Sequence, residues 1–309
     1  KPICLYRKLK QRGYFKNLKN LLNISDLSKS DFDSILSFAN SIKPNIEDCL
    51  KNKNIGLIFE KNSTRTRLSF QVGINQLHGK YIDIKLDELN LQRVESFEDT
   101  FEIMSCYLDA LVFRTTNHQK LVLALKFFKK PIINALSDSS HPCQAISDIF
   151  TLKEHFQKDD GFKIVWCGDL NNVLFSMLES MKFLKSSKID IFTDRKIYEN
   201  NHHNFPKEEN ISYHFELNDK ILNSTDCVMT DVFNSMNDKE DKESLLKKFM
   251  VNQELMKKTP DSAVFMHCLP AKIGSEVSND VIKGSKSIVL KQAKNRMVAQ
   301  RGIMKWLEL

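Results

Sequence analysis

The sequence lacks the patterns that mark several large classes of protein. It has no C-x-x-C pair, and its seven cysteines are odd in number and widely spaced. Both features argue against a disulfide framework and a zinc site, and they favour a reducing compartment. No apolar run approaches the length of a membrane span. The polar, basic N-terminus does not resemble a secretory signal, so we expect a cytoplasmic protein, although a mature organellar protein would share these features.

Charge is not concentrated in the way that nucleic-acid binding requires. Lys and Arg number 46 against 39 Asp and Glu, a formal excess of +7, and the lysines are scattered. A phosphate backbone needs clustered basic residues, so we expect no nucleic-acid partner, whereas a small anionic substrate fits the excess. The turn at residues 167–172 lacks the glycines of G-x-G-x-x-G, which argues against a nicotinamide cofactor. His and Cys show no metal-ligand spacing, so we expect no metal and no other cofactor.

The pattern of apolar segments predicts two α/β domains. With 309 residues, 41% hydrophobic and 28% charged, the chain is long enough for two globular domains. Short apolar runs alternate with helix-period segments in both halves, which is typical of doubly wound folds, each a mainly parallel sheet flanked by helices. The expected strands are residues 55–59, 80–84, 110–113, 131–134, 163–167, 189–192, 226–230, 263–267 and 287–290. The expected helices are residues 68–77, 97–108, 121–128, 145–156 and 173–184.

We expect the domains to join between residues 137 and 156, which gives a first domain of residues 1–143 and a second of residues 144–309. A C-terminal helix at about 293–309 is expected to pack back on the first domain. We expect residues 198–209 to form an exposed connection. The charged stretch 237–248 is expected to form either a mobile loop or a solvated helix face. Ligands of such folds gather at the carboxyl ends of strands, so the turns after the strands are the places to look for chemistry.

The segment Ser63-Thr64-Arg65-Thr66-Arg67 has the features of an anion site. It follows a predicted strand and opens a predicted helix, with Ser63 as a good N-cap residue. The free backbone N–H groups and the positive pole of the helix dipole bind phosphate readily there. Arg65 and Arg67 add planar, permanently charged groups. A capped helix with exposed arginines would have the same sequence, so alone the segment favours phosphate binding only slightly.

Two further turns of the first half carry polar groups. Arg114 follows the apolar run 110–113, and His141-Pro142-Cys143-Gln144 opens another predicted helix. At a helix start, His141 and Gln144 are suited to donate to an oxygen that becomes more negative during acyl transfer. A lone histidine there is more often a capping or surface residue, so this turn is only suggestive by itself.

The second half has three comparable turns. Asn171 and Asn172 follow a strand and suit the carboxylate of a small ligand at a helix N-terminus. Residues 230–236 and the sequence His267-Cys268-Leu269-Pro270 leave two other strands. Each turn has a plausible structural explanation. Together they place acidic, hydroxyl and thiol groups where a doubly wound sheet opens its crevice.

Taken in order, these motifs resemble the aspartate/ornithine carbamoyltransferase family, and within it the members that use ornithine. The resemblance covers residues 55–296, and the ordered set is specific, although any one motif could arise by chance. It is carried by Ser-Thr-Arg-Thr-Arg (63–67), Phe-Arg-Thr (113–115), His-Pro-Cys-Gln (141–144), Gly-Asp-x-Asn-Asn (168–172), Asp-Val-Phe-Asn-Ser-Met (231–236), His-Cys-Leu-Pro (267–270) and Asn-Arg (295–296).

The resemblance implies a first domain for carbamoyl phosphate, a second for the acceptor, and an active site in the interdomain cleft of a homotrimer or a multiple of it. It implies carbamoyl-phosphate binding by Ser63, Thr64, Arg65, Thr66, Asn90, Arg114, His141, Gln144 and Arg296. It implies ornithine binding by Asn172, Asp231, Ser235, Met236, Cys268 and Leu269. The implied catalytic residues are Arg65, Arg114, His141 and Cys268, and the implied reaction gives L-citrulline and phosphate, in arginine biosynthesis or in reverse.

Three alternatives stay open at this point. Putrescine is a possible acceptor within the same family, and a catalytically weak regulatory paralogue is a non-enzymatic reading. Whether Cys268 or the departing phosphate takes the proton of the amine is also open, because an ordinary thiol is mostly protonated near neutral pH. The chain departs from the family pattern at Asn90, Asn237 and Lys294, where relatives usually have Gln, Gly and Glu. Asn90 stands where relatives reach a neighbouring subunit's carbamoyl phosphate.

Overall fold

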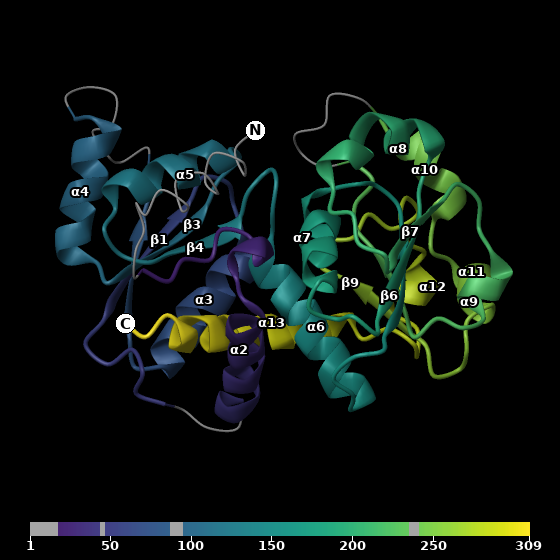
Figure 1. Cartoon of the computed structure of the whole chain (residues 1–309), viewed down its shortest axis with the longest axis horizontal. Helices are drawn as coiled ribbons and strands as arrows, with labels where there is room; N and C mark the ends of the chain where they lie inside the picture. The colour runs from purple at the N-terminus through teal and green to yellow at the C-terminus, as the bar shows by residue number, and fades with distance from the viewer. Residues whose placement is uncertain (1–17, 44–46, 87–94, 235–240) are drawn as a thin grey trace. The chain divides into compact units, whose positions relative to one another are not determined.

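The computed structural model describes residues 18–43, 47–86, 95–234 and 241–309, and it divides into two compact units (Figure 1). Unit 1 comprises Lys1–Ser147 with Arg296–Leu309, and unit 2 comprises Asp148–Asn295. Each unit contains one fully parallel sheet with helices on both sides, so the predicted α/β class is confirmed. In the described part of the chain, no helix is both long and apolar enough to cross a membrane.

The sheet of unit 1 has four strands in the order β2-β1-β3-β4. Its strands are β1 (Asn54–Phe59), β2 (Lys80–Ile84), β3 (Ala110–Arg114) and β4 (Ile132–Leu136). Strands β1 and β3 are almost wholly buried, as their apolar sequences predict for parallel strands covered on both faces. Strand β2 lies at an edge and is largely exposed.

Helices cover both faces of this sheet. They are α2 (Lys29–Ile42), α3 (Thr64–Gln76), α4 (Phe97–Tyr107), α5 (His118–Phe127), and parts of α6 (Pro142–Phe156) and α13 (Val289–Trp306). On one face, Phe101 of α4 and Leu121 of α5 pack with Phe113 of β3 in a buried apolar cluster. On the other face lie α2, α3 and α13 (Figure 1). Gly302 of α13 permits a close crossing, because a Cβ there would lie 2.6 Å from the Ile35 carbonyl oxygen of α2.

The sheet of unit 2 has five strands in the order β7-β6-β5-β8-β9. Its strands are β5 (Lys163–Cys167), β6 (Lys188–Phe192), β7 (Ile211–His214), β8 (Cys227–Thr230) and β9 (Val264–His267). Figure 1 shows α7 on one side of this sheet and α11 and α12 on the other. The helices of unit 2 are α7 (Asn172–Met181), α8 (Arg195–Asn201), α9 (Asp219–Leu222), α10 (Glu243–Leu246), α11 (Gln253–Lys257) and α12 (Asn279–Ile282), with short 3₁₀ turns at His202–Asn204 and Lys247–Phe249. A further 3₁₀ turn at Ile24–Asp26 belongs to unit 1.

Some predicted elements are wrong, and others were missed. The expected strand at 287–290 is only an isolated bridge between Ser287 and Phe265, because α13 begins at Val289. Helix α8 occupies part of the expected connection 198–209. Strand β7 was missed because it is a short, partly exposed edge strand without an apolar run.

Each sheet changes the direction of its connections at one place. In unit 1, β1 connects to β2 on one side, whereas β3, on the other side of β1, leads away to β4. In unit 2, β5 leads to β6 on one side, and β8 and β9 lie on the other. Ligands of open parallel sheets bind beyond the carboxyl ends of the strands at such a switch point. The fold therefore points to the turns after β1 and β3, and to those after β5 and β8.

A buried polar group shapes the turn that leads from β4 into α6. The wholly buried His118 ring makes a 2.8 Å hydrogen bond between Nδ1 and the Ser137 hydroxyl, and the His118 backbone N–H donates to Asp138 at 2.8 Å. The Ser137 N–H donates to the Ser140 carbonyl at 2.9 Å, which closes the turn just before His141. Burial lowers the pKa of His118 to about 4, although Asp138 acts in the opposite direction.

We expect His118 to make unit 1 sensitive to mild acid. The unfolded chain binds a proton at this ring below its ordinary pKa of 6.5, whereas the folded chain does so only near pH 4. Stability must therefore fall as the pH is lowered through this window, by about 2 kcal/mol between pH 7 and pH 5 from this group alone. Chemical denaturation followed by Trp306 fluorescence, in a Trp166→Phe background, measures this loss for unit 1.

In the same background, His118→Asn should flatten the dependence of stability on pH, whatever its effect on stability at pH 7. His203→Asn is the matched control, because His203 is exposed and its loss should leave the slope unchanged. An unchanged slope in the His118 variant would contradict the assignment.

Candidate active site

In unit 1, the candidate site begins where β1 and β3 end. Arg114, the last residue of β3, is paired in register with Phe59, the last residue of β1. Its Nη1 donates to the Ser63 hydroxyl at 2.9 Å. Ser63 is the N-cap residue of α3, as predicted, and its side chain makes no capping hydrogen bond to the helix N–H groups. The hydroxyl instead accepts from Arg114, which joins the two strand ends at the start of a 13-residue helix.

Two buried side chains approach this helix start. Arg296 of α13 places its Nη1 3.5 Å from the Thr66 hydroxyl, and both residues are almost fully buried. His141, directly before α6, is buried as well. Its burial lowers its pKa well below the usual range, and the positive charges of Arg296 and Arg114 lower the pKa further. His141 is therefore neutral near pH 7 and can donate one ring N–H without carrying charge.

The other predicted phosphate residues lie close in sequence to these groups. Thr64 and Arg65 are exposed in the first turn of α3, and the buried Gln144 lies in the first turn of α6, its N–H donating to the His141 carbonyl at 3.1 Å. Arg67 turns towards β2, because its guanidinium lies 5.1 Å from the Phe59 ring and 4.0 Å from the Asp83 carboxylate. Asn90 lies outside the described residues.

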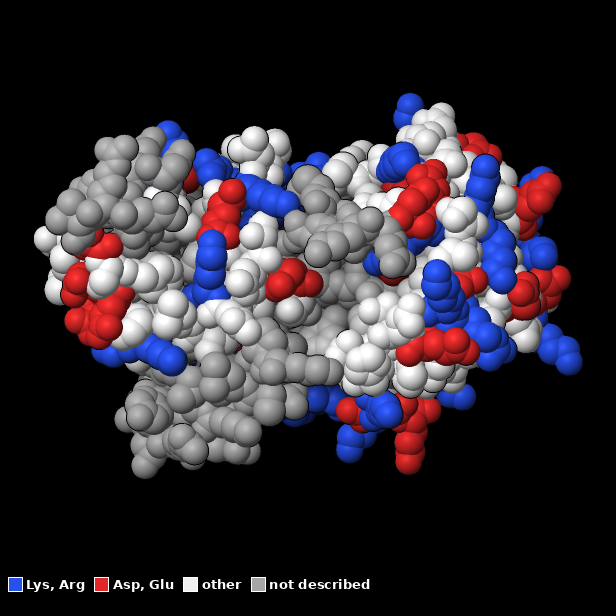
Figure 2. Space-filling view, turned by 90° about the horizontal axis from the view of Figure 1, so that it is seen from above, with Lys and Arg blue, Asp and Glu red and all other residues white. Residues whose placement is uncertain are grey.

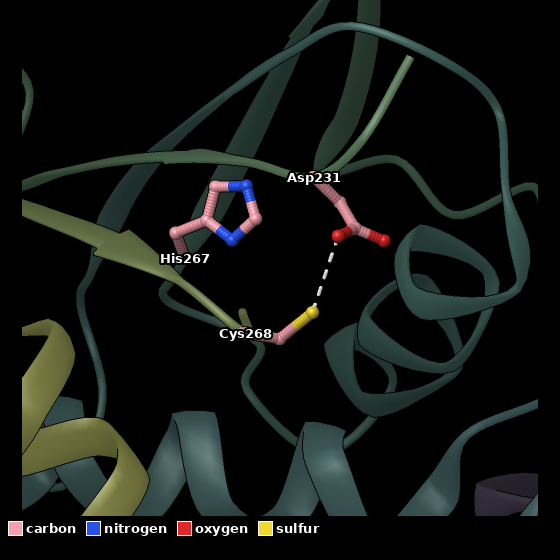
Figure 3. Close-up of side chains that lie close together, drawn as sticks. All are labelled: Asp231, His267 and Cys268. Atoms are coloured by element: carbon pink, nitrogen blue, oxygen red, sulfur yellow. Dashed lines mark hydrogen bonds between the residues drawn. The ribbon is translucent and has the colours of Figure 1, made fainter. Parts of the chain in front are cut away.

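In unit 2, the candidate site is built on β8 and β9. Thr230 and His267 are register partners at the ends of these strands, so the next residues, Asp231 and Cys268, leave the sheet side by side. The Cys268 thiol donates to Asp231 Oδ1 at 3.2 Å, as Figure 3 shows. Asp231 is nearly buried and Cys268 is partly exposed. The pair thus offers a carboxylate and a thiol beyond the strand ends.

The turn after β5 holds the other oxygen of this carboxylate. Asn171 donates from Nδ2 to Asp231 Oδ2 at 2.9 Å, and its Oδ1 caps α7 by accepting from the N–H groups of Val173 and Leu174. The predicted ligand Asn172 is the first residue of α7 and is partly exposed. The predicted Ser235 and Met236 lie outside the described residues.

His267, to which the sequence motif gave no role, lies beside this pair. Its ring, the Asp231 carboxylate and the Cys268 thiol bring three potential metal-ligand atoms within 4.8 Å of one another (Figure 3). Its Nδ1 already accepts the Leu269 N–H at 2.9 Å, so it could bind a metal only by giving up that hydrogen bond. Its other nitrogen faces the buried Glu276 at 3.2 Å. No sequence signal marks Glu276, which lies nine positions later in an irregular segment.

The two sets of groups suit different chemistry. Two guanidinium groups, hydroxyls and a helix N-terminus in unit 1 match a phosphate, and a neutral histidine N–H can polarise a carbonyl oxygen. In unit 2, a carboxylate held by an amide and a thiol matches an amine, which a carboxylate attracts as the ammonium ion. Each unit therefore carries the groups for one partner of a transfer reaction.

Comparison with known proteins extends these observations. A family model described as the carbamoyl-P binding domain of aspartate/ornithine carbamoyltransferase matches residues 19–154, and the model of the Asp/Orn binding domain matches residues 160–307. The ornithine carbamoyltransferase of Rhizobium johnstonii is 36% identical over 298 residues, which are 93% of this chain and 97% of that protein. The Methanocaldococcus jannaschii ornithine carbamoyltransferase is 36% identical over 305 residues, covering 93% and 98%.

Solved structures show the same likeness. The ornithine carbamoyltransferase of Pyrococcus furiosus superposes with a TM-score of 0.81 at 32% identity, over 92% of this chain and 95% of that one. The Burkholderia thailandensis ornithine carbamoyltransferase superposes with a TM-score of 0.85 at 29% identity, over 94% and 99%. The similarity therefore extends over both units and nearly the full length of these proteins.

Proposed function

The chain belongs to the aspartate/ornithine carbamoyltransferase family, and we propose that it transfers the carbamoyl group of carbamoyl phosphate to the δ-amine of L-ornithine, giving L-citrulline and phosphate. The observation that carries this choice of acceptor is the hydrogen-bonded pair of Asp231 and Cys268 at the ends of β8 and β9. A carboxylate in this place favours an acceptor that carries an amino group. The ornithine carbamoyltransferases with 34% to 37% identity to the chain support the same acceptor.

Carbamoyl phosphate is assigned to the groups of unit 1. Its phosphate is held at the N-terminus of α3 by Ser63, Thr64, Arg65 and Thr66, with Arg114 beside them. Its carbamoyl end is met by Arg114, His141, Gln144 and Arg296. The neutral His141 donates to the carbonyl oxygen, which becomes more negative as the carbon is attacked, and Arg114 and Arg296 neutralise that charge and the departing phosphate. Asn90 completes the proposed set, from a neighbouring subunit.

Ornithine is assigned to the groups of unit 2. Asn172, Asp231, Ser235 and Met236 bind its amino-acid part, and Cys268 and the Leu269 backbone border its δ-amine. The lone pair of the δ-nitrogen forms a bond to the carbonyl carbon, and the bond from that carbon to the phosphate oxygen breaks. The proton lost by the nitrogen passes to the departing phosphate or to the Cys268–Asp231 pair. Because carbamoyl phosphate is already activated, positioning and charge stabilisation supply most of the acceleration.

The proposal includes a role in arginine metabolism and an oligomer. The same groups catalyse citrulline formation in biosynthesis or its breakdown in arginine catabolism, because one active site serves both directions of a reaction. A homotrimer, or a multiple of it, is supported by apolar side chains exposed on unit 1. Leu68 and Val72 lie one turn apart on α3, and Tyr81 and Ile82 lie on the edge strand β2. An exposed edge strand with apolar residues is typical of a contact surface.

The distribution of charge gives no support to a nucleic-acid partner. On the face drawn in Figure 2, Lys and Arg side chains are interleaved with Asp and Glu, and the described residues there form no continuous basic stripe. A regulatory paralogue that binds carbamoyl phosphate without turnover is the remaining alternative. A protein that only binds carbamoyl phosphate has little use for Arg65, His141, Asp231 and Cys268 together. A turnover assay distinguishes such a paralogue from an active enzyme.

We expect the purified protein to form citrulline from carbamoyl phosphate and ornithine, and to use putrescine and aspartate far more slowly. Asp231 suits the amino groups of ornithine, and Asn172 suits its carboxylate, which putrescine lacks. Steady-state rates with the three acceptors at matched concentrations measure this preference. Equal or faster turnover of putrescine or aspartate would refute ornithine as the acceptor, and turnover of none would favour the regulatory paralogue.

Arg65→Ala should raise the carbamoyl phosphate concentration needed for half-maximal rate and lower kcat, on the order of 10²-fold if it removes one preorganised donor. Arg195→Ala is the matched control, because Arg195 lies in unit 2 with its guanidinium over the Phe215 ring. Cys268→Ala tests the acceptor side and should leave the carbamoyl phosphate requirement unchanged. If Arg65→Ala behaves like Arg195→Ala, the phosphate assignment fails.

Leu68→Asp combined with Ile82→Asp should dissociate the oligomer, because two carboxylates would be buried without partners at the proposed contact. Leu290→Asp is the control, since Leu290 is exposed to 78% but lies at the start of α13 in unit 2. Sedimentation velocity measures the outcome. Dissociation by the control alone, or a wild-type protein that is already monomeric, would refute the assigned contact.

A further inference from the structure

The side chain of His267 is wholly buried, and both of its ring nitrogens have partners. Nδ1 lies 2.9 Å from the backbone nitrogen of Leu269, and Nε2 lies 3.2 Å from Glu276 Oε1. The side chains of His267 and Glu276 are both completely inaccessible to solvent. This residue belongs to none of the groups assigned above, although it directly precedes Cys268.

These two contacts determine which nitrogen carries the proton. A backbone N–H is only a donor, so Nδ1 must accept from Leu269 with its lone pair. The ring proton is then on Nε2, where it donates to Glu276. A second proton on Nδ1 would point at the Leu269 N–H and break that hydrogen bond. The structure therefore requires the neutral ring with its proton on Nε2.

The residues around the ring are themselves hydrogen-bonded to other parts of unit 2. The His267 backbone N–H donates to Gln292 Oε1 at 2.9 Å, and Gln292 Nε2 donates to Asp148 at 2.7 Å, so the end of β9 is tied to α13 and α6 within unit 2. Glu276 Oε1 also accepts the Lys272 N–H at 2.5 Å. These hydrogen bonds therefore hold His267 Nδ1, which accepts from the Leu269 N–H, in place before any ligand binds.

The His267 ring fixes an unusual backbone conformation at Leu269. Leu269 has a φ of +58°, a left-handed conformation that a leucine rarely adopts. The hydrogen bond to His267 compensates for this conformation and fixes the plane of the peptide between Cys268 and Leu269. Because that peptide is planar, fixing the Leu269 N–H also fixes the backbone from which the Cys268 side chain leaves.

We propose that His267 is a positioning residue for the transfer reaction. Its Nε2-protonated neutral ring holds the Leu269 amide, so that the Cys268 thiol and the Leu269 backbone keep the geometry that borders the amine of the acceptor. This inference rests on the proposed function. It assigns His267 no part in proton transfer.

The contacts of Cys268 separate this role from that of a histidine base. In a Cys–His pair the ring accepts the thiol proton, and the two atoms must be hydrogen-bonded. Here the thiol donates to Asp231 Oδ1 instead, and the only ring lone pair of His267 is used by the Leu269 N–H. His267 therefore acts on Cys268 through the backbone.

Two substitutions of similar size separate the ring nitrogens. In His267→Asn, the amide oxygen takes the place of Nδ1 and can accept the Leu269 N–H. In His267→Gln, the amide nitrogen takes the place of Nε2 and can donate to Glu276, but nothing accepts the Leu269 N–H. We expect His267→Asn to keep kcat within about fivefold of wild type, and His267→Gln to lose on the order of 10²-fold in kcat. The KM for carbamoyl phosphate should change in neither.

Glu276→Gln supplies the second comparison, because its amide oxygen can still accept from Nε2 and from the Lys272 N–H. Near-normal kcat in Glu276→Gln and His267→Asn, with loss in His267→Gln, supports the proposal. Equal loss in both His267 variants with unchanged melting temperatures would overturn it in favour of an acid–base role. Equal retention in both would also overturn it, because the Leu269 hydrogen bond would then be dispensable.

The same experiment separates this inference from the proposed function. If wild-type protein forms no citrulline with ornithine, the proposed function fails. Nitrogen NMR of histidine-labelled protein, with His267→Asn to assign the signals, then still tests the ring. An unprotonated Nδ1 and a protonated Nε2 at neutral pH support the described tautomer. The opposite tautomer, or a doubly protonated ring, overturns the inference whatever the activity.

Discussion

In each unit, the hydrogen bonds between two parallel strands bring together side chains that are far apart in sequence. Pairing of β1 with β3 places Phe59 opposite Arg114, and the chain needs only four more residues to bring Ser63 to the same guanidinium. Pairing of β8 with β9 places Thr230 opposite His267, which makes neighbours of Asp231 and Cys268. A shift of one residue in either register would turn these side chains to the opposite face of the sheet. The strand register is therefore the condition on which the groups of each unit depend.

Burial then determines the charge of the groups that register has placed. In unit 1, two guanidinium groups lie near a buried histidine, and all three would repel one another if the ring were protonated. Desolvation and the two arginines act in the same direction, so the ring is neutral and the local excess of positive charge is carried by Arg114 and Arg296. Such an arrangement suits a dianionic phosphate and a neutral hydrogen-bond donor beside it. In unit 2 the Asp231 carboxylate accepts instead from two uncharged groups, the Asn171 amide and the Cys268 thiol.

The sequence was sufficient for those features that depend on local pattern. Buried parallel strands such as β1 and β3 have continuous apolar runs, and the polar turns after them are visible as breaks. Strand β7 was missed because an edge strand with partly exposed residues has no such run. The role of Ser63 was predicted only in part. Its place at the start of α3 follows from local sequence, but its hydroxyl accepts from Arg114, which lies 51 positions away. His267 and Glu276 could not be paired for a similar reason, since nothing in the irregular segment between them sets their distance.

Unit 1 is discontinuous in sequence, and this affects how the protein is made. It includes Arg296, and its α2 packs against residues 296–309 through Gly302 and through the Trp306 indole, which donates to Asp31 at 2.9 Å. Helix α3 meets the same segment at Gly73, where an added Cβ would lie 3.4 Å from Arg301 Cγ. During synthesis, which proceeds from the N-terminus, the whole of unit 2 leaves the ribosome before unit 1 has all its residues. Of the two units, the one whose translation begins first is thus the last that can be completed, and its apolar surface beneath α13 must stay unaggregated throughout that delay.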